Sequence, residues 1–292
     1  VCNISCNYCN RKYDCLHETR PGVTSEVLSP EEAYEKYKYV KNKVENLSVI
    51  GIAGPGDALA NFMEVKKSIQ LIREETPEII FCISTNGLNL PQYADQLIDL
   101  GISHVTITIN TIDPWIGAKI YKYIKYNNDY YFGIKGADIL IDKQLKGLKY
   151  LADNGVQCKV NIVMIKGINE DHIPLVVSKV KELGAVMTNI MPLIPAEGSD
   201  FADMPLVSKK ELNNLRDQCS KDIKQMYHCQ QCRADAIGQL TQDRSAEFRS
   251  CAGSKFTDII NSVDLENTTD SKSREFNNHN KDNHREDNSE KY

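Results

Sequence analysis

The chain has 292 residues, of which 41% are hydrophobic and 26% charged, ordinary values for a soluble protein of one large or two small domains. Its net charge of −5 at pH 7 argues against a nucleic-acid-binding surface. No apolar run is long enough to span a bilayer and no signal peptide is recognisable, so no membrane partner is expected. Ten cysteines in a chain of this size favour metal ligation over disulfides and predict a reducing, cytoplasmic location.

A group of three cysteines opens the chain: Cys2, Cys6 and Cys9, spaced C-x3-C-x2-C, with Tyr8 before the last. Three thiolates bind three irons of a cubane [4Fe–4S] cluster and leave the fourth iron open. This pattern resembles the radical S-adenosylmethionine superfamily, whose open iron binds S-adenosylmethionine. A zinc site is the alternative interpretation, although C-x2-C zinc ligands usually come as two pairs. Because the chain begins at Val1, inside the motif, we interpret it as a fragment.

Apolar runs rich in β-forming residues alternate with amphipathic stretches along the rest of the chain. Ser29 before Pro30, followed by two glutamates, is typical of a helix start. A strand leading into Cys2 is expected upstream of Val1. We predict strands at Ser48–Ala53, Ile79–Thr85, His104–Ile109, Gln157–Met164 and Ala185–Met191, and helices at Ser29–Val44, Asn61–Glu75, Leu90–Leu100, Asp138–Asp153, Asp171–Leu183 and Ser208–Met226.

This alternation indicates parallel strands covered by helices, because the strands are apolar nearly throughout. We therefore predict an α/β fold: a partial (β/α)6 TIM-like barrel of the radical SAM type, with its N-terminal strand missing and its site at the carboxyl ends of the strands. The segment 113–136 interrupts the rhythm and is either a short helix plus a loop near the cavity mouth or a packing insertion. The predicted divisions are a core at 1–245, a short extension at 246–263 and a polar, disordered tail at 264–292.

A glycine-rich segment follows the first of these strands. Gly54 and Gly56 would let backbone carbonyls approach the amino group of a bound S-adenosylmethionine, and Asp57 offers a carboxylate. A Gly-Pro-Gly turn is weak evidence by itself, but its position after a strand strengthens the interpretation.

Polar residues also end the next two strands. Hydroxyl and amide groups at such ends can bind the carboxylate or ribose of S-adenosylmethionine, although turn formation and helix capping are the common alternatives. Asn110 faces the cavity if Ile109 faces the helices. The candidate cofactor-binding residues are Ser84, Thr85, Asn86 and Asn110, together with Met191 as a wall for the adenine.

The remaining cysteines suggest further metal sites. Cys15 lies six residues after Cys9, and Cys229 and Cys232 form a C-x2-C pair after a long helix. Cys82 shares a strand face with Ser84, and without further context it is interpreted as a buried core cysteine. The cysteines interpreted as structural are Cys158, Cys219 and Cys251. The histidines interpreted as structural or solvent-exposed are His17, His104 and His172.

Six segments carry a more specific pattern: CNISCNYCNRKYDCLHETRPGVTSE, GIAGPGD, CISTNGL, INTIDPWIGAKIY, MPLIPAEG and HCQQCRADAIG. Together they resemble the NifB family, the radical S-adenosylmethionine proteins of nitrogenase cofactor assembly. The matching segments extend from Cys2 to about Asp243. The resemblance implies fusion of two [4Fe–4S] precursor clusters into an eight-iron product, with a carbide derived from the S-adenosylmethionine methyl group.

The resemblance also implies partners and ligands. The partners would be iron–sulfur cluster donors, a downstream scaffold protein and an electron donor. In the family, a further Cys and His of one precursor site lie before the radical motif, so that site is expected to be incomplete here. By position, the resemblance implies that Cys2, Cys6 and Cys9 bind the radical cluster. It implies that Cys82 binds one precursor cluster and that Cys15, Cys229 and Cys232 bind the other.

Two other function classes stay open at this point. One is a radical S-adenosylmethionine enzyme that modifies a peptide and carries an auxiliary cluster on the C-x2-C pair. The other is an interaction protein that is not an enzyme and is stabilised by zinc or carries a cluster. Iron, acid-labile sulfide and the fate of the methyl carbon distinguish them.

Overall fold

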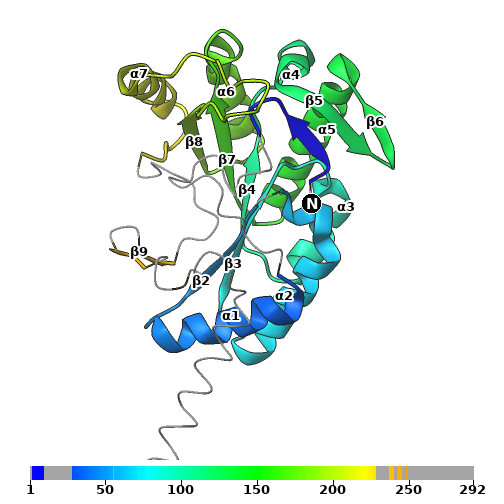
Figure 1. The fold of residues 1–292 in the computed structure, drawn as a ribbon, viewed down its shortest axis with the longest axis vertical. Helices are drawn as coiled ribbons and strands as arrows, with labels where there is room; N and C mark the ends of the chain where they lie inside the picture. The colour runs from blue at the N-terminus through cyan, green and yellow to red at the C-terminus, as the bar shows by residue number, and fades with distance from the viewer. Residues whose placement is uncertain are drawn as a thin grey trace, which may run out of the picture.

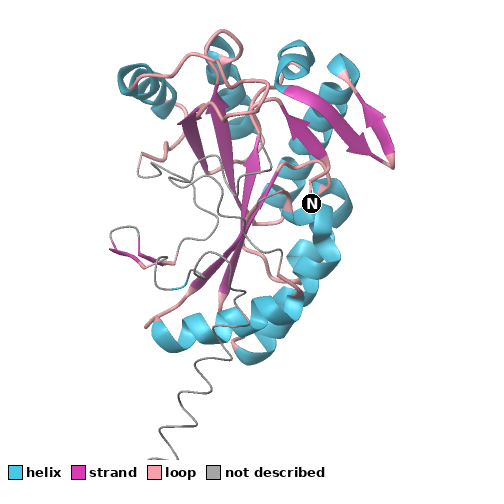
Figure 2. Cartoon of the chain, viewed as in Figure 1, coloured by secondary structure: helices cyan, strands magenta, loops and turns pink. Residues whose placement is uncertain are grey.

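The computed structural model describes residues 2–9, 28–54, 56–227, 237–239, 242–244 and 248. A five-stranded parallel sheet in the order β2-β3-β4-β7-β8 lies at its centre, and helices curve around one side of it (Figures 1 and 2). The strands are β2 (Val49–Ile52), β3 (Ile80–Thr85), β4 (His104–Thr108), β7 (Gln157–Met164) and β8 (Met187–Pro192). The helices are α1 (Pro30–Lys43), α2 (Phe62–Glu75), α3 (Leu90–Asp99), α5 (Gly133–Asp153), α6 (Ile173–Glu182) and α7 (Lys209–Ser220), with 3-10 turns η1 (Ala58–Asn61) and η2 (Glu170–His172).

The two faces of the sheet differ in character. On β3, Phe81 and Ile83 are fully buried and pack with the helices, whereas Cys82 and Ser84 between them are only half-buried. Successive side chains of a strand point to opposite faces, so the same alternation continues on the neighbouring strands. We call the second face the polar face of the sheet; it consists of Cys82, Ser84, Thr106, Thr108, Lys159, Asn161 and Asn189. The predicted α/β architecture with parallel strands is confirmed.

A small antiparallel sheet stands beside the main one. The first cysteine motif, in which no strand was predicted, contains β1 (Ile4–Cys6), which pairs with β5 (Tyr121–Tyr126). The predicted short helix exists as α4 (Pro114–Ile120), but the predicted loop is wrong, because a hairpin of β5 and β6 (Asp129–Tyr131) follows. Asn127 and Asn128 have φ of 50° and 67°, the left-handed values that a tight hairpin turn requires.

Two helices have an end that differs from the predicted one by five residues or more. Helix α5 begins at Gly133 instead of Asp138, because small residues allow its first turn to pack closely. A Cβ on Gly136 would lie 2.7 Å from the carbonyl oxygen of Tyr131. Helix α7 ends at Ser220, and the chain then returns to the edge of β8, where Gln225 forms a parallel bridge with Thr188.

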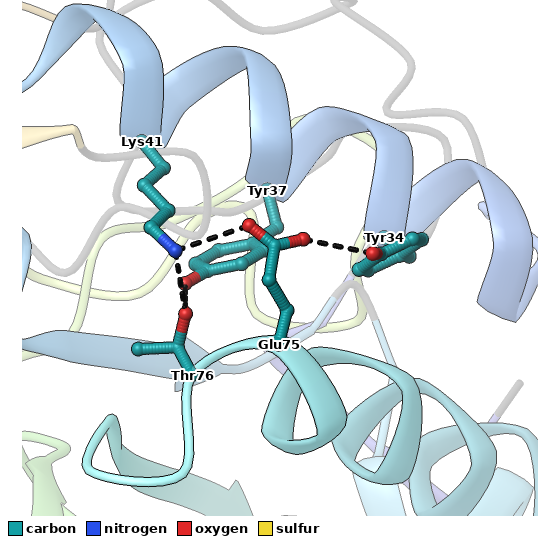
Figure 3. Close-up of polar contacts among 5 residues, drawn as sticks. All are labelled: Tyr34, Tyr37, Lys41, Glu75 and Thr76. Carbon is teal, nitrogen blue, oxygen red and sulfur yellow. Dashed lines mark hydrogen bonds and ion pairs between the residues drawn. The ribbon is translucent and has the colours of Figure 1, made fainter.

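A polar network joins α1 to the end of α2 (Figure 3). The Lys41 ammonium donates to Glu75 at 3.0 Å and to the Thr76 hydroxyl at 2.7 Å. Tyr34 donates to the Glu75 carboxylate at 2.8 Å, and the buried Tyr37 hydroxyl lies 2.5 Å from that of Thr76. The ion pair is largely exposed and contributes little, whereas the buried Tyr37 contact contributes about 1 kcal/mol. The network fixes α1 against the carboxyl end of α2.

Several predictions fall outside the described residues. These concern Cys15, His17, Cys229, Cys232 and Cys251, the extension at 246–263 and the tail at 264–292. The short strands β9 (Gly238–Gln239) and β10 (Gln242–Asp243) pair antiparallel within the described part. None of the described helices combines the length and apolar character that crossing a membrane requires.

The apolar face supplies the first testable prediction. Phe81 has 0% exposure and its ring lies 5.2 Å from the Arg73 guanidinium, so Phe81→Ala leaves a cavity in the helix-covered core. We expect a loss of about 3–5 kcal/mol in the free energy of unfolding, measured by urea denaturation. The matched control is Ile80→Ala on the same strand, whose side chain is 39% exposed and whose removal should cost about 1 kcal/mol or less.

Candidate functional site

The cysteine loop, residues 2–9, lies at the carboxyl end of the parallel sheet. Asn86 follows β3 directly, and its Nδ2 donates to Asn3 Oδ1 at 2.7 Å and lies 3.9 Å from Cys2 Sγ. The Asn86 side-chain oxygen accepts from the backbone N–H of Leu88 at 2.9 Å, which fixes the orientation of the amide. The strand end therefore holds the beginning of the loop.

Asn110, after β4, holds the other end of the loop. It is fully buried, and its Nδ2 donates to the Tyr8 hydroxyl at 3.0 Å and to that of Tyr121 at 3.4 Å. Its Oδ1 accepts from the backbone N–H of Val163 at 2.9 Å. Burial, followed by the nearby Cys6, raises the pKa of Tyr8, so this phenol stays a neutral hydrogen-bonding group. Asn110 therefore contacts the motif itself and joins β4 and β7 to it.

The backbone of the loop is bound as well. Asn7 donates from its N–H to the Ile120 carbonyl at 2.9 Å and from its side chain to the Lys119 carbonyl at 2.8 Å. Phe201 N–H in turn donates to the Asn7 carbonyl at 3.1 Å. The loop is thus held from the strand ends, from the end of α4 and from the segment after β8.

The three thiols of the loop suit a cluster. Cys2 and Cys6 are half-buried, Cys9 is exposed, and none of them is in a disulfide. Among the described residues no three Cys, His or acidic side chains form a single-ion site. In a cubane each cysteine binds a different iron, and Cys2, Cys6 and Cys9 would hold such a [4Fe–4S] cluster.

Asp57 connects the first glycine-rich turn to the next strand end. Its carboxylate accepts from the Thr85 hydroxyl at 3.0 Å, from the Leu59 N–H at 2.9 Å and from the Asn86 N–H. The side chain is 5% exposed, and burial raises its pKa despite these donors. Sequence reasoning proposed Asp57 and Thr85 as cofactor contacts; the structure shows them binding each other.

The glycines beside Asp57 form a tight turn. A Cβ on Gly54 would lie 2.9 Å from the backbone nitrogen of Gly56, and Gly56 has a φ of 99°. Neither position accepts a side chain without strain. The conformation at the end of β2 therefore requires glycine at both positions.

Gln144 of α5 is a site residue that sequence reasoning missed. Its Nε2 donates to the carbonyls of Asn86 at 2.7 Å and Thr108 at 2.8 Å, so the side chain joins the ends of β3 and β4. The residue is 1% exposed. A glutamine at an otherwise apolar position of a helix was the available signal.

The other predicted site residues divide between two places. Ser84 and Cys82 lie together on the polar face, as the alternation predicted. Met191 is buried with Ile4 and Leu88 in a hydrophobic cluster against which Cys2, Cys6 and Tyr8 pack. Met191 therefore belongs to the hydrophobic cluster that supports the cysteine loop.

Four cysteines and histidines that were not predicted as ligands lie in the following environments. Burial raises the pKa of Cys158 to about 12 and that of Cys219 to about 11, which makes both thiols poor metal ligands. His172 Nε2 accepts from the Ile112 N–H at 3.2 Å, and burial lowers its pKa. His104 is exposed and lies 2.9 Å from the Ser103 hydroxyl.

A cysteine loop fixed over the carboxyl ends of parallel strands is the arrangement of one protein class. Residues 1–180 match the Radical SAM superfamily, and the chain belongs to this family. S-adenosylmethionine and a [4Fe–4S] cluster are the cofactors of these enzymes.

Individual curated proteins within this superfamily are similar to the chain in sequence. The chain is 51% identical over 252 residues to the FeMo cofactor biosynthesis protein NifB of Bradyrhizobium diazoefficiens, covering 85% of this chain and 50% of that protein. It is 48% identical over 252 residues to NifB of Azotobacter vinelandii, with coverages of 85% and 50%. These identities confirm the resemblance to NifB, and the chain spans about half the length of these relatives.

Solved structures share the fold. Streptococcus suis SuiB bound to S-adenosylmethionine has a TM-score of 0.53 at 14% identity, covering 77% of this chain and 47% of that one. Native anSMEcpe with AdoMet and Kp18Cys peptide has a TM-score of 0.53 at 17% identity, with coverages of 78% and 61%. At such identities the likeness concerns the fold alone.

Asp57 supplies the second testable prediction. Asp57→Ala leaves three buried donors without their acceptor, so we expect the free energy of unfolding to fall by about 3 kcal/mol. The raised pKa of Asp57 means that its contribution is fully present below pH 3.8, its ordinary value, and decreases as the pH rises through the folded-state pKa. The difference between wild type and variant should therefore shrink from pH 3.8 upward in urea titrations.

The matched control is Asp153→Ala. Asp153 forms an exposed ion pair with Lys149 at 2.6 Å, and its loss should cost less than about 1 kcal/mol. A difference between wild type and Asp57→Ala that grows as the pH rises would contradict the assigned direction of the pKa.

Proposed function

We propose that this chain is the radical S-adenosylmethionine part of a nitrogenase cofactor biosynthesis protein. Its reaction would fuse two [4Fe–4S] precursor clusters and insert a carbide from the S-adenosylmethionine methyl group, giving an eight-iron product. The observation that carries the proposal is the cysteine loop held by Asn86 and Asn110 over a sheet face that presents a fourth cysteine, Cys82. The 51% identity to a NifB protein supports it.

The residues of the loop have distinct tasks in this proposal. Cys2, Cys6 and Cys9 would hold a [4Fe–4S] cluster, which would supply the electron that cleaves S-adenosylmethionine to methionine and a 5′-deoxyadenosyl radical. The methyl group would come from a separate S-adenosylmethionine molecule. Asn110 and Asn86 fix the loop, because the reacting atoms must be positioned to within fractions of an ångström for a fast transfer. The Gly54–Gly56 turn offers backbone carbonyls to the amino group of S-adenosylmethionine, and Ser84 offers a hydroxyl from the polar face.

The precursor clusters are substrates, and the proposal gives them separate ligands. Cys82 binds one of them on the polar face. Cys15, Cys229 and Cys232, which lie outside the described residues, bind the other. Exposed iron–sulfur clusters react with oxygen, so the reaction belongs in a reducing compartment, where cluster donors, an electron donor and a scaffold that receives the product would be the partners.

The fate of the methyl carbon tests this function. The full-length protein is reconstituted anaerobically with iron and sulfide and incubated with dithionite and S-adenosylmethionine labelled in its methyl group. We expect the label in an acid-labile iron–sulfur product, together with 5′-deoxyadenosine. Label recovered only on an added peptide would instead identify a peptide-modifying enzyme, and a colourless, zinc-only preparation would identify a protein without radical chemistry.

Cys82 supplies a further prediction. Cys82→Ala should lower the iron content of the reconstituted protein by one cluster's share and abolish the labelled product, while 5′-deoxyadenosine still forms. Iron and acid-labile sulfide are measured per protein, with Cys158→Ala as the control, because Cys158 lies on the apolar face with 0% exposure. An iron content equal to that of wild type would return Cys82 to the role of a packing residue.

A further inference from the structure

Lys159 of β7 is a half-buried cation without an anionic partner in the described part of the chain. The contact that its ammonium makes there is with the thioether sulfur of Met226 at 3.8 Å. No carboxylate among the described residues forms an ion pair with it. Removing a charge from water is costly unless an opposite charge or hydrogen bonds compensate. An anion beside Lys159 would provide that compensation.

The register of the sheet places Lys159 near Cys82. Ser84 pairs with Thr106, and Thr106 pairs with Lys159, so these three residues form one row across β3, β4 and β7. Cys82 lies two residues before Ser84 on the same face. Neighbouring strands are about 4.8 Å apart, so the Cα atoms of Ser84 and Lys159 are about 10 Å apart. Lys159 and Cys82 therefore face the same space above the sheet.

A second donor stands beside Lys159. Asn161 follows on the same face of β7, and Asn189 of β8 pairs with it in register. Asn189 Nδ2 donates to Asn161 Oδ1 at 3.3 Å, and Asn189 is 1% exposed. This contact uses the oxygen of Asn161, so its Nδ2 remains as a donor on the same strand face as Lys159. The two residues together form a cationic group with several N–H donors.

The surroundings of this group indicate the kind of anion. Met187 pairs with Lys159 in register on β8, Met226 contacts its ammonium, and Cys82 lies across the face. Sulfur-containing side chains are soft and polarisable, in contrast to the backbone N–H groups and arginines that typically bind phosphate or carboxylate. A bulky anion with a sulfide surface suits this setting, and the sulfides of an iron–sulfur cluster accept N–H hydrogen bonds.

We propose that Lys159 and Asn161 form a docking group for the anionic precursor cluster that Cys82 binds. This inference rests on the proposed function, because it takes the cluster on Cys82 as the substrate. Lys159 supplies the positive charge and Asn161 an amide donor to cluster sulfides, while Asn189 orients Asn161. Lys159 and Asn161 hold the cluster on the side of the polar face opposite Cys82. They also raise its reduction potential, because a nearby positive charge favours the reduced, more negative state.

The test compares Lys159→Met with Lys159→Arg in protein reconstituted anaerobically with ferrous iron and sulfide. Methionine keeps the length of the side chain and removes its charge, whereas arginine keeps the charge. Two quantities are measured: the rate at which an iron chelator removes iron, and the reduction potential of the electron paramagnetic resonance signal that Cys82→Ala abolishes. The control is Lys149→Met, an exposed lysine of α5 paired with Asp153.

We expect Lys159→Met to lose the Cys82-dependent iron about tenfold faster than wild type, since a charge-assisted hydrogen bond is lost. Its signal should move to a more negative potential, whereas Lys159→Arg and Lys149→Met stay close to wild type. Circular dichroism confirms that each variant is folded. If Lys159→Met matches wild type in both quantities while Cys82→Ala still removes iron, the docking group is wrong and the proposed function stands. If Cys82→Ala removes no iron, the substrate site fails and the docking group with it.

Discussion

Two amide side chains, Asn86 and Asn110, join the cysteine loop to the carboxyl ends of neighbouring parallel strands, and the candidate site depends on these contacts. Strand β1 has only three residues and pairs with one other strand, which by itself would not fix a loop in place. The amides add side-chain hydrogen bonds at both ends of the loop, and the Asn110 residue is fully buried. Buried amides of this kind specify one geometry, because any other arrangement leaves polar atoms unsatisfied.

The sheet below the loop separates stability from chemistry. Its helix-covered face contains the apolar core, with fully buried residues such as Phe81 and Val160. Its polar face carries Cys82, Ser84 and Lys159, all of which are half-buried. Alternate residues of a strand point to opposite faces, so the residue types on the two faces can differ. The same strands therefore provide both a stable core and a polar surface.

Sequence reasoning succeeded where local patterns decide the outcome. The strand at Gln157–Met164 was predicted to the residue, and the shared face of Cys82 and Ser84 followed from alternation. It did not predict the contacts between residues distant in sequence: Asn110 binds Tyr8 across 102 positions, and Asp57 binds Thr85 across 28. The pairing of β1 with β5 has the same origin, and no local pattern in the cysteine motif indicates it.

The central claim is that Asn86 and Asn110 aim the cysteine loop at the site. The most direct measurement is the yield of 5′-deoxyadenosine per bound radical cluster in the Asn86→Ala/Asn110→Ala double variant, reconstituted anaerobically and reduced with dithionite in the presence of S-adenosylmethionine. The account predicts a cluster that still forms on the three cysteines but a yield lower than wild type by about tenfold or more, because the geometry is lost. Equal yields per cluster in the double variant and wild type would contradict it.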